Sequence, residues 1–315
     1  MDIICMGEML IDFTPGNEPD SYVANPGGAP ANVAISLARN GLQAGFLGIL
    51  GNDDFGRKLM DTLQKDGVKV LCSELTDQAV TTLAFVTLYE NGERSFTFAR
   101  KPGADMLLSQ KDVRKEDVEA CRMLHAGSVS LSDNPCREAI FYGMKTASEQ
   151  GKFVSFDVNY REMIWHNREK CKNEVDKVFP FVDFLKISDE ELFFVGGEES
   201  RIPDFMEKNG IAVVIETLGS QGARYFFRGQ SQMVEGLKVK AVDATGAGDA
   251  FWGGFLTSIL SCKIGNISEL TEEMVQNAVI YGNVSGALCV QKKGGIPALP
   301  GRREIIQYLE TQSAQ

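Results

Sequence analysis

Short apolar runs, rich in β-branched and aromatic residues, alternate along this chain with longer amphipathic segments. The apolar runs predict strands at Ile3–Gly7, Gly45–Gly51, Met123–Gly127, Phe153–Asp157, Phe184–Ile187 and Val213–Thr217. The amphipathic segments predict helices at Ala31–Asn40, Asp54–Asp66, Pro135–Gln150, Glu190–Phe194 and Ile202–Asn209. Strands separated by helices form right-handed βαβ units. We therefore expect an α/β body built around a mostly parallel sheet.

One segment departs from this alternation. Thr81–Glu90 and Glu93–Arg100 are β-rich runs joined by Asn91-Gly92, a dipeptide that suits a type I′ turn. Because no helix separates the two runs, they predict an antiparallel hairpin that projects from the α/β body. Such a hairpin is a candidate lid or dimer-forming flap. From Asp243 onward the chain is mostly helix-like.

Charge, cysteine and histidine content exclude several classes of protein. The 32 Lys and Arg residues stand against 43 Asp and Glu, a net charge of −11 without a basic run, which argues against a nucleic-acid partner. Seven scattered cysteines without a CxxC pair indicate reduced thiols, and two separated histidines cannot build a zinc site. The N-terminus has no basic leader, and no apolar stretch of 18 residues occurs. We expect a cytoplasmic protein with small-molecule partners and no membrane partner.

The strongest local motif is Asp243-Ala244-Thr245-Gly246-Ala247-Gly248-Asp249, which leads into an apolar helical run. Gly246 and Gly248 permit tight backbone at a helix start, so that successive amides can converge on an anion while Asp249 faces the same point. A plain helix cap with a glycine turn explains the same residues equally well. The motif is not a dinucleotide fingerprint, because Phe251 stands where GxGxxG needs glycine and the carboxylate would repel a pyrophosphate.

A second motif, Asn25-Pro26-Gly27-Gly28-Ala29-Pro30-Ala31-Asn32, leads into a predicted helix. Its glycines allow close approach of a ligand, and Asn32 offers a donor and an acceptor that suit sugar hydroxyl groups. A Pro/Gly turn before a helix is the simpler interpretation. Asp12 follows the first predicted strand, where open α/β sheets place their ligands, although a turn residue is common there.

Three further segments follow predicted strands. In residues 157–161, Arg161 can supply the positive charge that phosphoryl transfer needs. In residues 186–191, Glu191 can help to hold magnesium, directly or through water. For both, a surface charge or a salt bridge is the alternative. Residues 217–222 form a strand-to-glycine turn that suits backbone contact with a nucleotide, or simply a tight connection.

Taken together, the blocks at 27–32 and 243–249 resemble the two signatures of the ribokinase/PfkB family of sugar kinases, roughly 215 residues apart and in the expected order. Segments at 7–13, 84–88, 104–108, 186–188 and 292–300 resemble the fructokinases of that family. The resemblance covers residues 1–315 as a single domain. It implies a ribokinase-like three-layer α/β/α sandwich with a small β-lid from about residues 12–30 and 81–100.

The resemblance implies an ATP-dependent kinase that phosphorylates D-fructose to fructose 6-phosphate. Asp249 would be the general base that removes the proton of the primary hydroxyl as it attacks the γ-phosphate. The amides of Gly246, Ala247 and Gly248 would form an anion hole, and Arg161 would meet the ATP phosphates.

The same resemblance assigns the binding residues. Those implied for the sugar are Asp12, Gly28, Asn32 and Asp249, with Phe98 and Arg100 at the inner end of the lid. Those implied for ATP are Ser188, Thr217, Gly219, Gly222, Gly246, Gly248 and Asn283. Glu191 would help to hold Mg²⁺, and Asp243 and Thr245 would hold K⁺. Many relatives carry Asn where this chain has Ser188. A homodimer formed through the β-lid is also implied.

The spacing of these motifs leaves the substrate open. A kinase for 2-keto-3-deoxygluconate, another ketose or a nucleoside is the alternative within the family, because specificity rests on lid and loop residues. A catalytically inactive relative that acts as a binding subunit is the alternative from another class. The presence of Asp249, the loop glycines and Arg161 favours an active enzyme.

Overall fold

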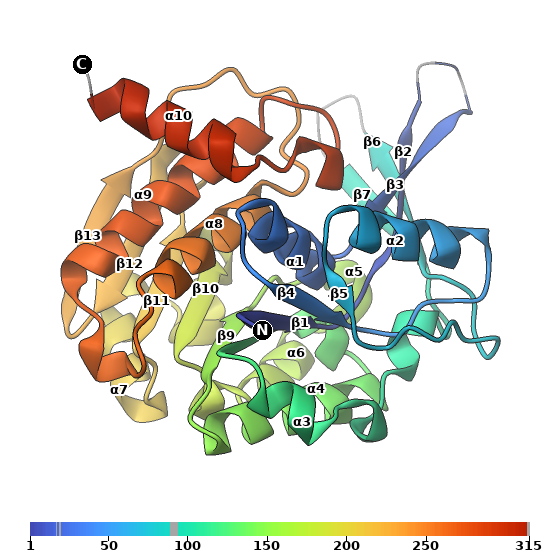
Figure 1. Cartoon of the computed structure of the whole chain (residues 1–315), viewed down its shortest axis with the longest axis horizontal. Helices are drawn as coiled ribbons and strands as arrows, with labels where there is room; N and C mark the ends of the chain where they lie inside the picture. The colour runs from blue at the N-terminus through green and yellow to red at the C-terminus, as the bar shows by residue number, and fades with distance from the viewer. Residues whose placement is uncertain (17, 19, 89–93, 314–315) are drawn as a thin grey trace.

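A computed structural model describes residues 1–16, 18, 20–88 and 94–313 of the chain. Within these residues a central sheet holds nine strands in the order β13-β12-β11-β10-β9-β8-β1-β4-β5 (Figure 1). They are β1 Ile3–Met6, β4 Ala44–Leu47, β5 Lys69–Val70, β8 Met123–Gly127, β9 Phe153–Asp157, β10 Phe184–Ser188, β11 Val213–Thr217, β12 Gly222–Phe227 and β13 Gln230–Glu235. They run parallel except for β12 and β13, which add antiparallel pairing at one edge. The prediction of a mostly parallel sheet is confirmed.

Helices cover both faces of this sheet (Figure 1). They are α1 Ala29–Arg39, α2 Asp54–Lys65, α3 Lys115–Glu119, α4 Cys136–Glu149, α5 Glu162–Trp165, α6 Arg168–Val175, α7 Ile202–Asn209, α8 Ala247–Ser261, α9 Glu272–Cys289 and α10 Arg302–Ser313. Successive residues of a strand face opposite sides: Ile3 and Cys5 pack in one core with α1, α8 and α9, whereas Ile4 and Met6 pack in a second core with α4, α6 and α7. Strands buried on both faces carry continuous apolar runs, which explains their pattern in the sequence. The expected α/β/α sandwich is confirmed.

A second, smaller sheet has the strand order β3-β2-β6-β7 and stands off one side of the sandwich (Figure 1). Its strands are β2 Leu10–Pro15, β3 Tyr22–Gly27, β6 Leu83–Leu88 and β7 Arg94–Ala99. We call it the lid sheet. The antiparallel pairing of β6 with β7 confirms the predicted hairpin. The expected turn at Asn91-Gly92 lies outside the described residues.

The structure differs from the sequence-based expectations in several places. Asp12 does not lie in a turn at the end of β1, because the chain bends at Gly7 and enters β2 of the lid sheet, where Asp12 pairs with Asn25. The predicted helix at 190–194 is a 3-10 helix, Asp189–Val195. The β12-β13 hairpin was not predicted, because β13 lies at the sheet edge and its mostly exposed polar residues form no apolar run.

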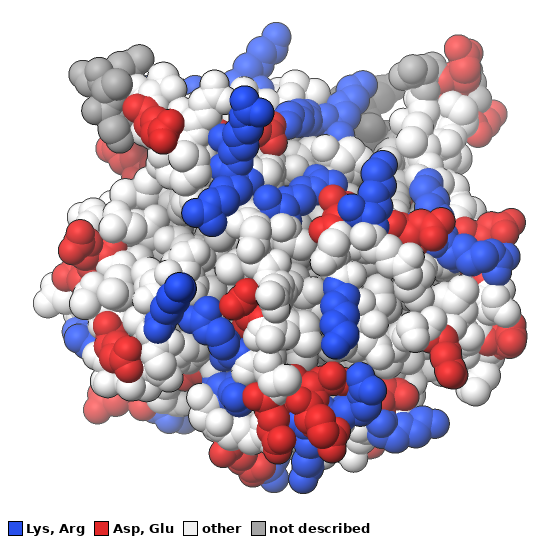
Figure 2. Space-filling view, in the orientation of Figure 1, with Lys and Arg blue, Asp and Glu red and all other residues white. Residues whose placement is uncertain are grey.

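The carboxyl ends of the parallel strands meet at one edge of the main sheet, which is where open α/β sheets bind ligands. Glu8 follows β1, Val129 follows β8 and Arg161 follows β9, and all three line one cavity there. Lys and Arg side chains intermingle with Asp and Glu on the face shown in Figure 2, so the net charge of −11 forms no single acidic field on that face. No helix in the described part of the chain is long and apolar enough to span a membrane.

Candidate active site

A cavity of about 260 Å³ lies between the lid sheet and the carboxyl ends of the main strands. We call it the polar cavity. Its lining includes Glu8, Leu10, Asp12, Gly28, Asn32, Phe98, Val129, Asn159, Arg161, Ile164, Ala244, Thr245, Gly246 and Asp249. The structure thus brings together most of the residues expected to bind sugar, from the lid sheet, α1, the segment after β9 and the start of α8.

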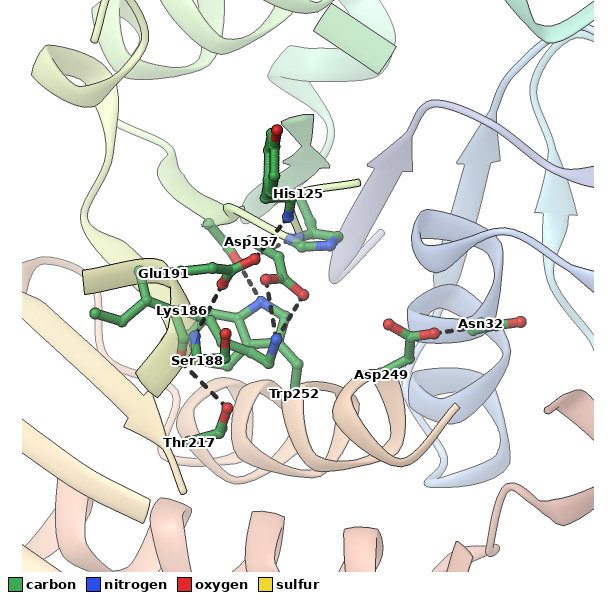
Figure 3. Close-up of polar contacts among 12 residues, drawn as sticks. Asn32, His125, Asp157, Lys186, Ser188, Glu191, Thr217, Asp249 and Trp252 are labelled. Carbon is green, nitrogen blue, oxygen red and sulfur yellow. Dashed lines mark hydrogen bonds and ion pairs between the residues drawn. The ribbon is translucent and has the colours of Figure 1, made fainter. Parts of the chain in front are cut away.

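Asp249 lies in the first turn of α8 and points toward α1 (Figure 3). The side-chain amide of Asn32 donates a hydrogen bond of 2.7 Å to Asp249 Oδ2. Burial raises the pKa of Asp249 to about 6, against the opposing effect of this hydrogen bond. The group is therefore ionised near neutral pH, yet basic enough to accept a proton in a reaction. Asn32 Oδ1 is buried and has no hydrogen-bond partner among the described residues.

The glycine loop before α8 has the backbone that an anion site requires. Gly246 is the N-cap of α8, with φ +77° in the left-handed region, and a Cβ there would lie 3.1 Å from the Cα of Gly295. The amide of Ala247 donates to the carbonyl of Ala244 at 3.2 Å, so it is partly engaged in the turn. The positive end of the α8 dipole therefore opens toward Asp249 and its cavity.

Sequence reasoning missed a buried ion pair beside this loop. Lys186 Nζ lies 2.9 Å from Asp157 Oδ1 and 2.8 Å from Oδ2, with both side chains almost fully buried (Figure 3). A Cβ on Gly248 would lie 3.7 Å from Lys186 Nζ, so the ammonium group packs against the first turn of α8. Neighbouring carboxylates, chiefly Asp157, raise the pKa of Lys186 despite desolvation, which by itself lowers it. A lysine within the apolar run Phe184–Ser188 was the available signal.

Glu191 is buried, so it is not the exposed surface charge that was the alternative interpretation of the sequence. Its Oε1 accepts a hydrogen bond from the amide of Tyr160 at 2.6 Å, and its Oε2 accepts one from the amide of Ser188 at 2.8 Å. Burial raises its pKa, and the Asp157 carboxylate adds to this effect. Within the described residues, no group of three or more His, Cys, Asp and Glu side chains could hold a metal ion.

A second cavity, of about 410 Å³, lies on the other side of the glycine loop. We call it the apolar cavity. Thr217, Gly219, Gly222 and Asn283, all expected at the nucleotide, line it together with Gly248. Ser188, also expected at the nucleotide, instead lines a neighbouring cavity with Arg161 and Glu191.

Asp243 joins the glycine loop to the segment before α10. Its Oδ1 accepts hydrogen bonds from the amide and the hydroxyl of Thr245, at 2.9 and 2.7 Å. Its Oδ2 accepts one from the amide of Gly294 at 2.9 Å. This carboxylate therefore holds the two loops together.

Arg100 does not lie over the cavity as expected. Its buried guanidinium forms an ion pair of 2.6 Å with Asp105 and donates to the hydroxyl of Ser132 at 2.9 Å. It is absent from the cavity lining, whereas Phe98 is part of it. The side chain is engaged behind the cavity wall because a buried guanidinium needs a carboxylate partner. Glu8, which sequence reasoning did not single out, lines the cavity; its position directly after the first strand was the available signal.

Known proteins are similar to this chain over nearly its whole length. The sequence profile described as pfkB family carbohydrate kinase matches residues 1–302. Fructokinase-1 of Oryza sativa subsp. japonica is 39% identical over 319 residues, which are 98% of this chain and 98% of that protein. The crystal structure of fructokinase with bound ATP from Xylella fastidiosa has a TM-score of 0.90 at 31% identity and covers 99% of both chains. A fructokinase double mutant from Vibrio cholerae O395, in a form bound to fructose, ADP and potassium ion, has a TM-score of 0.87 at 33% identity and covers 98% of both chains. This chain therefore belongs to the pfkB family of carbohydrate kinases, as its two signature blocks predicted.

Proposed function

We propose that this chain is an ATP-dependent fructokinase, which transfers the γ-phosphate of ATP to D-fructose and releases fructose 6-phosphate and ADP. The observation that carries the proposal is the position of the glycine loop. Ala244 lines both the polar and the apolar cavity, and Asp249 and Gly248 face one cavity each. A hydroxyl group in one cavity and a phosphate chain extending from the other would meet at Asp249. Similarity to proteins named fructokinase supports fructose as the acceptor.

In this mechanism Asp249 is the general base. Asn32 holds one carboxylate oxygen, so the other can accept the proton of the sugar's primary hydroxyl. The hydroxyl oxygen forms a bond to the γ-phosphorus while the bond from that phosphorus to the ADP oxygen breaks. Little basicity is required, because positioning and charge neutralisation supply most of the barrier reduction.

Two parts of this chain would supply positive charge at the transferred phosphoryl group. The amides of Gly246, Ala247 and Gly248 stand at the positive end of the α8 dipole. Arg161 lines both the polar cavity and the neighbouring cavity of Glu191, which suits contact with phosphate oxygens. Asp12, Gly28, Asn32 and Phe98 would hold the sugar with its primary hydroxyl toward Asp249.

Kinases use ATP as its magnesium complex, in which the ion neutralises charge on the phosphates. Each carboxylate oxygen of Glu191 already accepts a backbone hydrogen bond, which fits an ion held through water better than direct ligation. Ser188 would support this arrangement through its amide. Asp243 and Thr245 supply oxygen donors for a potassium ion, which would fix the glycine loop against the segment at Gly294.

The lid sheet would also form a homodimer interface. Tyr22 is 50% exposed and Val23 is 52% exposed, although both belong to a strand of that sheet. Exposed apolar side chains on a strand are typical of protein interfaces. Sedimentation analysis of the purified protein tests this part of the proposal separately.

The test of the proposed function is an ADP-release assay with ATP, magnesium and potassium. Fructose, glucose, ribose, 2-keto-3-deoxygluconate, fructose 6-phosphate and adenosine are compared as acceptors. We expect a preference for fructose, and loss of roughly 10² or more of the turnover in Asp249→Asn. Asp183→Asn is the matched control, because it removes a carboxylate at the amino end of β10, whereas the polar cavity lies at the carboxyl ends of the strands. Preference for another acceptor, or an active Asp249→Asn enzyme, would contradict the proposal.

A further inference from the structure

Glu8 is a buried carboxylate residue at the wall of the polar cavity. It follows β1 through Gly7, it is one of the residues that line the cavity, and only 2% of the residue is exposed. Burial raises the pKa of Glu8 to about 7. Among the described residues, Ser130 donates the one side-chain hydrogen bond to this carboxylate, through its hydroxyl to Oε2.

The Glu8 carboxylate can accept more hydrogen bonds than the one from Ser130. An ionised carboxylate accepts up to about four hydrogen bonds, and buried polar groups are normally paired. The cation that acts on Glu8, Arg100, already forms an ion pair with Asp105, so it does not neutralise Glu8 by itself. Further donors would come from a ligand bound in the polar cavity, which Glu8 helps to line.

Contacts between Ser130 and the backbone at Gly7 and Glu8 fix the position of Glu8. A Cβ on Gly7 would lie 2.5 Å from Ser130 Oγ, so this hydroxyl can approach the chain only because residue 7 is glycine. The amide of Glu8 donates to the same hydroxyl at 3.1 Å. Ser130 therefore contacts both the main chain and the side chain of Glu8, which limits how far the carboxylate can turn.

Glu8 and the proposed base belong to different elements of the cavity wall, because Glu8 follows β1 whereas Asp249 lies in the first turn of α8. The charges that act on Glu8 are Arg100 and Asp105, at the base of the lid sheet. By contrast, Arg161 acts on both Asp12 and Asp249. A sugar whose primary hydroxyl meets Asp249 would present its remaining hydroxyl groups to the other walls, and Glu8 stands in one of them.

We propose, on the basis of the fructokinase function above, that Glu8 is a specificity-determining residue of the polar cavity. Its carboxylate accepts hydrogen bonds from sugar hydroxyl groups on the side of the cavity that adjoins the lid base. A site that bonds a hydroxyl group through a buried charged acceptor discriminates strongly against a substrate without that hydroxyl, because the acceptor is then left unpaired.

The test compares wild type with Glu8→Gln at pH 8, above the Glu8 pKa of about 7, so that the wild-type carboxylate is mostly ionised. The substitution keeps the shape of the side chain and replaces one acceptor oxygen by a donor. We expect the KM for fructose to rise by roughly 10-fold or more, while kcat and the KM for ATP stay within about two-fold. Asp183→Asn is again the control, since it removes a carboxylate whose pKa burial also raises, far from the cavity. If Glu8→Gln does not fold, Glu8→Asp is used, because the shorter side chain withdraws the carboxylate from the cavity.

Fructose analogues that lack one hydroxyl group separate this role from a structural one. In wild type, the analogue without the bonded hydroxyl should lose about 10-fold or more in kcat/KM. In Glu8→Gln, that analogue and fructose should differ by about three-fold at most. An unchanged KM for fructose, or an equal loss for every analogue in both enzymes, would overturn the proposal. If wild type prefers another sugar, the proposed function fails, and the Glu8 comparison is read on that sugar and its deoxy analogues.

Discussion

Replacing Asp249 by Asn should remove activity and stabilise the fold at the same time. The pKa of this carboxyl rises from 3.8 to about 6 in the folded protein, chiefly through burial. Between these values the folded chain binds more protons than the unfolded chain, so stability falls as the pH rises and the full cost is present above about pH 7. One pKa unit corresponds to about 1.4 kcal/mol, which makes the cost about 3 kcal/mol at pH 8.

The neutral amide of Asn carries no such cost and can still accept the hydrogen bond from Asn32. Because the Asp249 side chain partly faces the cavity, solvent reduces the effect, and we expect a gain of about 1 to 3 kcal/mol in the free energy of unfolding at pH 8. At pH 5 the folded wild type is mostly protonated at Asp249, so the gain should fall to about half.

Urea unfolding at both pH values, followed by circular dichroism, measures this difference. Asp61→Asn is the control, because Asp61 is exposed and its replacement should change stability by less than about 0.5 kcal/mol. A variant that is no more stable than wild type at pH 8 would refute the reasoning. So would a gain of the same size at pH 5 and pH 8, because the stabilisation would then not come from the ionised carboxylate.

Four further outcomes follow from the same structure. Below about pH 6 the kcat at saturating sugar should fall toward about tenfold per pH unit, because protonated Asp249 cannot act as a base, and a pH–rate profile shows this limb. Gly246→Ala should destabilise the fold by about 1 kcal/mol or more and slow turnover, since φ is +77° there, whereas Gly248→Ala should change unfolding by less than about 0.5 kcal/mol, since its Cβ would make only ordinary contacts. Asp105→Asn leaves a buried guanidinium without its carboxylate and should cost about 3 kcal/mol or more in urea unfolding. Asn283→Ala removes bonds to two carbonyls at the end of β13 and should raise the KM for ATP more than the KM for sugar in initial-rate measurements.

Most strands of the main sheet could be predicted from the local pattern of apolar residues in the sequence. Met123–Gly127, Phe153–Asp157 and Val213–Thr217 were predicted as strands with the bounds that the structure has. Parallel strands covered on both faces are buried along nearly their whole length, so most of their residues are apolar and a short run is enough to recognise them. The polar edge strand β13 lacked this signal and was not predicted.

The sequence alone also indicated the loop that we propose as the catalytic one, because glycines followed by an acid at a helix start can be recognised from neighbouring residues in the chain. Tertiary structure decided which side chains that loop meets. Asn32 bonds Asp249 across 217 positions, Ser130 bonds Glu8 across 122, and Arg100 turns to Asp105 instead of the cavity. Each of these pairings forms because a buried polar group needs a hydrogen-bond or ion-pair partner once the strands are packed. The spacing of residues along the chain does not show which side chain will be that partner.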